Sequence, residues 1–132
     1  MRVLLAIIIA NAVVPLADWY FFGLLWHEKY NAYPEVWRRS QGDSGETRAV
    51  ALSALVGALT PTVFVLLCMA LGIVHLRQTL LLGVGLWVMG PLPMWIWNWL
   101  FMKVHPLILV SGVLGWLIRL GVSALVVGIL LA

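Results

Sequence analysis

Apolar residues come in four long blocks that are separated by shorter polar stretches. The blocks cover about residues 3–26, 49–74, 79–101 and 106–132, and each contains at most one charged side chain. A helix needs about 20 mostly apolar residues to cross a bilayer core about 30 Å thick, so each block is long enough to span a membrane. The pattern predicts an all-α integral membrane four-helix bundle that forms a single domain over residues 1–132.

The connections between the blocks predict where helices stop and bend. Residues 27–48 form the longest polar stretch, and we expect an interfacial segment there. Proline removes a backbone donor and crowds the preceding turn, so Pro61 predicts a kink in the second helix. Pro91 and Pro93 predict a bend in the third. A tight turn is expected at the three polar residues before that helix, His75, Arg77 and Gln78.

Composition agrees with a membrane solvent and excludes several protein classes. The chain is 64% hydrophobic and 10% charged, and its mean hydropathy is +1.06, which is outside the range of soluble domains. The net charge of +3 comes from dispersed Lys and Arg residues, without the continuous basic stripe that nucleic acid binding requires. Cys68 is the single cysteine, so neither a disulfide framework nor a cysteine metal cluster is expected.

Positive residues predict the orientation in the membrane, because Lys and Arg in short loops favour the cytoplasmic side. The first and third connections carry five of them, Lys29, Arg38, Arg39, Arg48 and Lys103, whereas Arg2 and Arg77 fall on the other side. We therefore expect loops one and three to be cytoplasmic and both termini to lie opposite. The lipid bilayer is the expected partner.

Two opposite charges inside the apolar blocks are the sharpest candidates for a site. Arg119 falls near the middle of the fourth block, where a charge costs a few kcal/mol on insertion scales. Asp18 is the one acidic residue in the four blocks, and antiparallel first and fourth helices bring it to a similar depth. With Asn98 and Asn11, these residues form the predicted polar cluster. They either form a structural ion pair or face a cavity that holds a polar ligand; alternatively, Arg119 meets a lipid headgroup or a partner subunit.

Aromatic residues concentrate at one predicted membrane face. They lie at the end of the first helix, in the connection after it, and at the end of the third helix, and we name them the aromatic face: Trp19, Trp26, Trp37, Trp95 and Trp99. Tryptophans at headgroup depth are typical of an interfacial belt. The alternative is an aromatic-walled pocket for an amphipathic ligand.

Catalytic and metal motifs have little support. His27, Glu28 and His105 fall at the same face, but their spacing matches no zinc signature, so they are weak metal candidates. The sequence contains no glycine-rich phosphate loop and no nucleophile beside a base. We expect no cofactor and no enzymatic activity.

Short motifs in the chain resemble a family of bacterial four-helix membrane proteins of unknown function. They are Gly23-Leu24-Leu25-Trp26 followed by Trp37, Asn98-Trp99-Leu100-Phe101, and Gly128-Ile129-Leu130. The resemblance covers nearly the whole chain, which departs from the family in having Arg119 where a histidine is common. It implies the four-helix fold and a bacterial cytoplasmic (inner) membrane, and no activity.

Three functions are consistent with the sequence. The first is binding of a small amphipathic ligand, lipid or partner at the aromatic face, with Asp18, Asn98 and Arg119 as polar anchors. The second is a small homodimeric proton-coupled transporter that uses Asp18. The third is an accessory subunit of a larger membrane complex, in which the ion pair is purely structural.

Overall fold

The computed structural model describes residues 1–21 and 44–132, and this part of the chain is helical without strands. The helices are α1 (Arg2–Asp18), α3 (Ser44–Gly57), α4 (Leu59–Leu71), α5 (Leu76–Met89), α6 (Pro91–Phe101) and α7 (Pro106–Leu130). Within the described residues, four segments are long and apolar enough to cross a membrane: Arg2–Phe21, Ala51–Leu71, Leu76–Phe101 and Pro106–Leu130. The predicted all-α, multi-pass membrane fold is confirmed.

Helix boundaries differ from the prediction by several residues. Residues 22–26 of the first predicted helix and most of the predicted interfacial segment lie outside the described residues. The second helix begins at Ser44, before the predicted residue 49, and ends at Leu71 instead of 74. Gly72 ends it because this residue takes a φ of 68°, and the N–H of Ile73 then donates to the carbonyl of Cys68 over 2.9 Å.

The turn predicted before the third helix is misplaced. His75 precedes α5 as predicted, but Arg77 and Gln78 lie inside its first turn, because α5 already begins at Leu76. The chain reverses over the residues between Leu71 and Leu76. Hydropathy marks the apolar part of a helix, whereas the helix itself extends into the polar residues beside it.

Both predicted proline bends appear as interruptions of a helix. α3 and α4 are separated at Ala58, one turn before Pro61, whose nitrogen cannot donate to the carbonyl one turn back. α5 and α6 are separated at Gly90, directly before Pro91 and Pro93. α1 also carries an internal proline, Pro15, and continues through a wider helical turn to Phe21.

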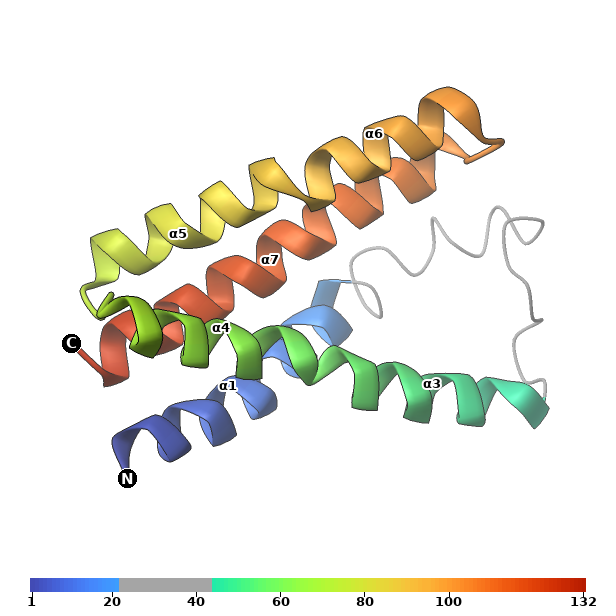
Figure 1. Cartoon of the computed structure of the whole chain (residues 1–132). Coiled ribbons are helices and arrows are strands. Elements are labelled where there is room, and N and C mark those ends of the chain that lie inside the picture. Colours follow the sequence, from blue (N-terminus) through green and yellow to red (C-terminus); the bar gives the residue numbers. More distant parts are fainter. Residues whose placement is uncertain (22–43) are drawn as a thin grey trace.

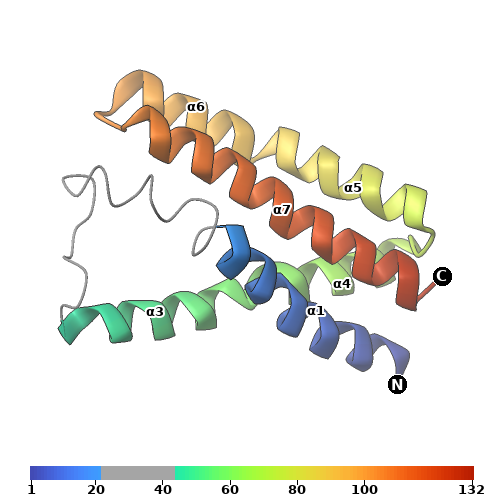
Figure 2. The ribbon, with the colours of Figure 1, turned by 180° about the vertical axis from the view of Figure 1, so that it is seen from behind.

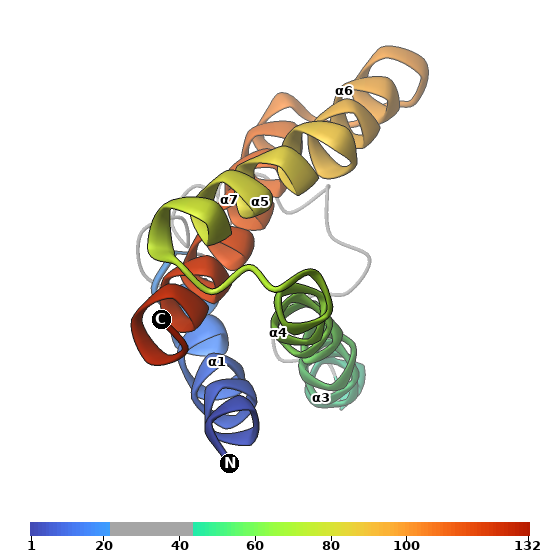
Figure 3. The same ribbon diagram turned by 60° about the vertical axis from the view of Figure 1, so that its left-hand side comes forward.

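Helix α7 is the centre of the bundle and contacts α1, α4, α5 and α6. Figure 1 shows α5 and α6 along one side of α7, and Figure 2 shows α1 crossing α4 on the other. In Figure 3 the two termini come forward, at the end where α4 turns into α5. The buried core joins small and aliphatic residues of three helices: Ala6, Ala10, Phe64, Val65, Cys68, Leu120, Ala124, Val126 and Val127.

Small residues let α7 approach its neighbours closely. Ser111, Gly115 and Ser123 are spaced by four and eight residues on α7, which places them on one face, and all three are buried. At Gly112 a side chain would overlap the indole ring of Trp95, and at Gly128 it would come within 2.6 Å of the Cα of Leu76. These contacts fix how α5 and α6 lie on α7, and therefore which face of α7 is left for α1.

Candidate functional site

The structure brings Asp18 and Arg119 together as an ion pair between α1 and α7. Asp18 is the last residue of α1, and Arg119 lies near the middle of α7. The Nε of Arg119 donates to Oδ2 of Asp18 over 2.8 Å, and the two side chains keep 29% and 23% of their surface exposed, respectively. Because α1 and α7 run antiparallel (Figure 1), the predicted match in depth is realised.

Most of the hydrogen-bonding capacity of this pair is unused. An arginine side chain has five N–H donors, and the bond from Nε is the one side-chain hydrogen bond that Arg119 makes within residues 1–21 and 44–132. The second carboxylate oxygen of Asp18, Oδ1, is buried and has no hydrogen-bond partner in this part of the chain. The pair is therefore electrostatically matched but incompletely hydrogen bonded.

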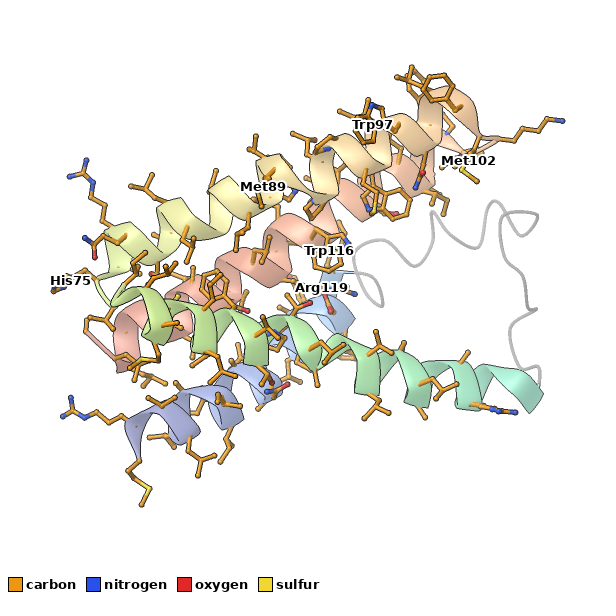
Figure 4. The ribbon with its side chains drawn as sticks, in the orientation of Figure 1. His75, Met89, Trp97, Met102, Trp116 and Arg119 are labelled. Carbon is orange, nitrogen blue, oxygen red and sulfur yellow. The ribbon has the colours of Figure 1, made fainter. Side chains whose placement is uncertain are left out.

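Trp116 lies next to the guanidinium group of Arg119. The Cζ atom of Arg119 lies 5.3 Å from the centre of the Trp116 ring, which is within the range of a cation–π contact. The two residues are one turn apart on α7, and Figure 4 shows both side chains on the face of α7 that looks toward α1 and α4. The indole ring therefore provides an aromatic neighbour that favours the cationic side chain at this depth.

Packing on the rest of α7 determines where Arg119 points. Leu120 and Ala124 are buried on the face that Gly83 and Thr79 of α5 contact, and the Thr79 hydroxyl donates to the carbonyl of Ala124 over 2.9 Å. Side chains of a helix lean toward its N-terminus. Arg119 therefore points toward α1 and toward the end of the bundle where α6 turns into α7.

Asn11 belongs to a different polar contact. Its Nδ2 donates to Oγ1 of Thr62 and to the carbonyl of Ile7, both over 2.9 Å. The side chain thus faces the bundle, as its spacing from Asp18 predicts, but it links α1 to α4. Sequence reasoning missed Thr62, although this hydroxyl next to Pro61 was a polar position in an otherwise apolar helix.

Asn98 does not join the ion pair. It is half-buried on α6, and within the described residues its side chain forms no hydrogen bond. The neighbouring Trp95 packs on Gly112, which is seven residues, or about 10 Å of helix, from Arg119. Asn98 lies almost a further turn beyond Trp95, on the side away from Arg119.

The aromatic face is only partly described. Trp26 and Trp37 lie outside the described residues, whereas Trp19 is 61% exposed and Trp99 is exposed as well. Trp95 is half-buried, and its indole Nε1 is buried without a hydrogen-bond partner among the described residues. Trp97, which Figure 4 shows on the outer side of α6, adds a further exposed ring.

Only one of the three weak metal candidates lies among the described residues. His27 and Glu28 lie outside the described residues, and the Nδ1 of His105 accepts the backbone N–H of Leu107 at the start of α7 over 3.1 Å. In the part of the chain that the structure describes, no three His, Cys, Asp or Glu side chains are grouped as a metal site requires. His105 is thus a helix cap in this structure.

Comparison with known protein families, with curated proteins and with solved structures finds no match. The two described motifs of the suspected family are helix ends: Asn98-Trp99-Leu100-Phe101 closes α6, and Gly128-Ile129-Leu130 closes α7. The resemblance therefore stays a prediction, and the functional argument rests on the ion pair.

Proposed function

We propose that this protein binds an amphipathic small molecule or a lipid where the end of α1 meets the middle of α7, with Arg119 as the polar anchor and Asp18 as the carboxylate that holds it. The observation that carries the proposal is an ion pair that lies in two membrane-spanning segments, is partly exposed, and holds a single hydrogen bond between its partners. Ionisable groups at membrane depth are costly and mark binding sites or ion paths by default.

A purely structural pair would be expected to differ from this one. Burying two charges is offset only when the geometry is good and further hydrogen bonds satisfy the remaining donors and acceptors. Arg119 leaves its terminal nitrogens without partners in the described residues, and Oδ1 of Asp18 is unpaired. A bound polar group supplies acceptors for the terminal nitrogens of Arg119.

The surroundings of the pair suit an amphipathic molecule. Trp116 lies within cation–π distance of the guanidinium group, and Trp19 and Tyr20 are exposed directly after Asp18. Ligand sites are typically apolar and aromatic, with a few polar groups that fix orientation. Asn98 is not part of this proposed site, because α6 holds it near the other half of α7.

The proposal includes a location. We infer a bacterial inner membrane, with the first and third connections in the cytoplasm and both termini opposite, and membership of the four-helix family named above. The excess of Lys and Arg in the first and third connections supports the orientation.

Native mass spectrometry of the full chain, extracted gently from its own membrane, tests the proposal. We expect a retained amphipathic molecule of defined mass that is lost in Arg119→Leu. Arg77→Leu is the matched control, because it removes an exposed arginine at the start of α5. A molecule that is retained equally in Arg119→Leu, or the absence of any retained molecule, contradicts the proposal. A stoichiometric second protein in place of a ligand supports an accessory subunit.

A proton-coupled homodimeric transporter is the second candidate, and Oδ1 of Asp18, which has no hydrogen-bond partner among the described residues, favours it. A carboxylate at membrane depth with a free oxygen is a group that can accept and release a proton. We expect proton-coupled flux into proteoliposomes that is lost in Asp18→Asn. Proteoliposomes that show no flux under a proton gradient rule this candidate out.

A further inference from the structure

We infer that the polar group bound at this site is anionic, a phosphate or carboxylate of an amphipathic ligand, and that the terminal nitrogens of Arg119 hold it. This inference rests on the proposed function and names the chemistry of its ligand.

The terminal edge of the Arg119 guanidinium group is available to a ligand. Asp18 contacts Arg119 through Nε, and the terminal nitrogens Nη1 and Nη2 have no hydrogen-bond partner within the described residues. Two parallel N–H groups on this terminal edge match two oxygens of one carboxylate or phosphate, which is the geometry in which arginine binds these groups most strongly.

The accessibility of Asp18 and Arg119 determines which ligand charge the pair favours. Oδ1 of Asp18 is buried, so the unpaired acceptor is closed to an approaching molecule. The arginine side chain is 29% exposed and carries the unused donors. The Asp18 side chain is 23% exposed, but its Oδ2 already accepts from Nε of Arg119. A cationic or donor-rich ligand therefore meets a carboxylate with one buried oxygen and one oxygen already bonded, whereas an anionic oxygen meets a cation with unused donors.

Other cations lie at the end of the bundle toward which Arg119 points. Arg119 leans toward the N-terminus of α7, the end at which the exposed Lys103 precedes α7 and the exposed Arg48 lies near the start of α3. These cations favour anions at the same face. A phospholipid headgroup and a free anion share the required chemistry, and experiment separates them.

Asp18 acquires a specific role in this arrangement. Its carboxylate balances Arg119 when the site is empty, but it repels a second anion on the same guanidinium group. Replacing it with the isosteric, uncharged asparagine is therefore expected to strengthen binding of an anionic ligand. If the ligand were instead held directly by Asp18, Asp18→Asn would weaken its binding.

Binding of three probes to the purified full chain in an uncharged detergent tests the inference. The probes are a short-chain phosphatidylglycerol, an uncharged monoacylglycerol and inorganic phosphate, and native mass spectrometry gives the bound fraction. We expect phosphatidylglycerol to bind about tenfold more tightly than the uncharged lipid. Arg119→Lys should weaken it about tenfold, because lysine keeps the charge but lacks the fork. Asp18→Asn should strengthen it severalfold, and the control Arg77→Gln should not change it.

The outcomes separate this inference from the proposed function. Equal binding of charged and uncharged lipids, lost together in Arg119→Leu, overturns the anionic ligand and leaves the amphipathic site standing. No Arg119-dependent binding of either lipid overturns both. Weaker binding of phosphatidylglycerol in Asp18→Asn also overturns the inference. If Asp18→Asn does not fold, Arg119→Lys provides the test, and unchanged binding in Arg119→Lys overturns the inference. Displacement of the lipid by inorganic phosphate assigns a free anion, and failure to displace it assigns a lipid headgroup; both support an anionic ligand.

Discussion

Asp18 and Arg119 depend on each other, because each is costly to leave alone within a membrane-spanning segment. Among the described residues, Arg119→Leu leaves the Asp18 carboxylate with neither a counter-charge nor a hydrogen bond. Asp18→Leu likewise removes from the guanidinium group its one counter-charge and hydrogen-bond acceptor in this part of the chain. We expect each single change to lower the free energy of unfolding by about 1–3 kcal/mol, less than for a fully buried pair because both side chains are partly exposed.

The double variant Asp18→Leu with Arg119→Leu should recover most of that loss, since it removes both charges together. A double-mutant cycle of unfolding free energies in mild detergent measures the coupling, with Arg77→Leu as the surface control. Additive losses would mean that the two side chains do not stabilise each other.

A second residue-scale contact can be tested with nearly isosteric changes. Thr62→Val removes the Oγ1 acceptor that Asn11 reaches from α1, and hydrogen bonds between membrane helices contribute about 0.6 kcal/mol on average. We expect a loss of this size in the unfolding free energy. Thr60→Val, on the same helix, is the control, because within the described residues the Thr60 side chain has no hydrogen bond. Equal effects of the two variants would argue against the Asn11 contact.

These residues show what sequence alone can predict about a membrane site. The ion pair was predictable because the apolar blocks contain one acid and one base, so the pairing had a single solution. The partner of Asn11 was not, because the rotation of α4 about its axis depends on packing against α1 and α7. Asn98 was grouped with the charges by residue type, whereas its distance from them follows from how α6 lies on α7.

At the scale of the element, the pair of α5 and α7 depends on close backbone approach. A methyl group at Gly128 would come within 2.6 Å of the Cα of Leu76, so α5 must move away to accommodate it. We expect Gly128→Ala to lower the unfolding free energy by about 1–3 kcal/mol. Gly121→Ala on the same helix meets no atom within 4 Å and should be neutral or slightly stabilising, because alanine favours helix.

Thermal unfolding of both variants in detergent measures the contrast. A destabilised Gly121→Ala beside an unchanged Gly128→Ala would contradict the packing of α5 on α7.

Helix number and interruptions were predictable, and helix ends were not. Length and hydropathy gave the four spans, and Pro61, Pro91 and Pro93 marked the interruptions because proline removes a donor wherever it occurs. The starts of α3 and α5 fall in polar sequence, where hydropathy carries no signal. Ser44 to Arg48 and Arg77 to Gln78 are helical because backbone hydrogen bonding continues past the apolar block.

At the scale of the whole molecule, the described helices expose many large apolar side chains on the outer surface of the bundle. Leu52, Leu55 and Val56 of α3 are exposed, as are many leucines of the other helices. This distribution is expected where lipid replaces water as the solvent, because the hydrophobic effect then no longer drives helices together. Small residues, cross-helix hydrogen bonds and the ion pair therefore carry a larger share of the specificity.

The sidedness of the bundle gives the last prediction. An even number of crossings places both termini and the turn between α4 and α5 on one side, and residues 102–105 on the other. Gln78→Cys and Met102→Cys report these two sides without altering the charges that set orientation, since both side chains are neutral and exposed.

In bacterial spheroplasts, a membrane-impermeant maleimide should label Gln78→Cys directly and Met102→Cys only after the membrane is permeabilised. The unmodified chain is the blank, because its one cysteine, Cys68, is buried within α4. The reverse pattern would invert the orientation inferred from Lys and Arg and move the anion site to the outer leaflet. Labelling of both positions from the same side would contradict the crossing by α5 and α6, and with it the bundle that places Arg119 against Asp18.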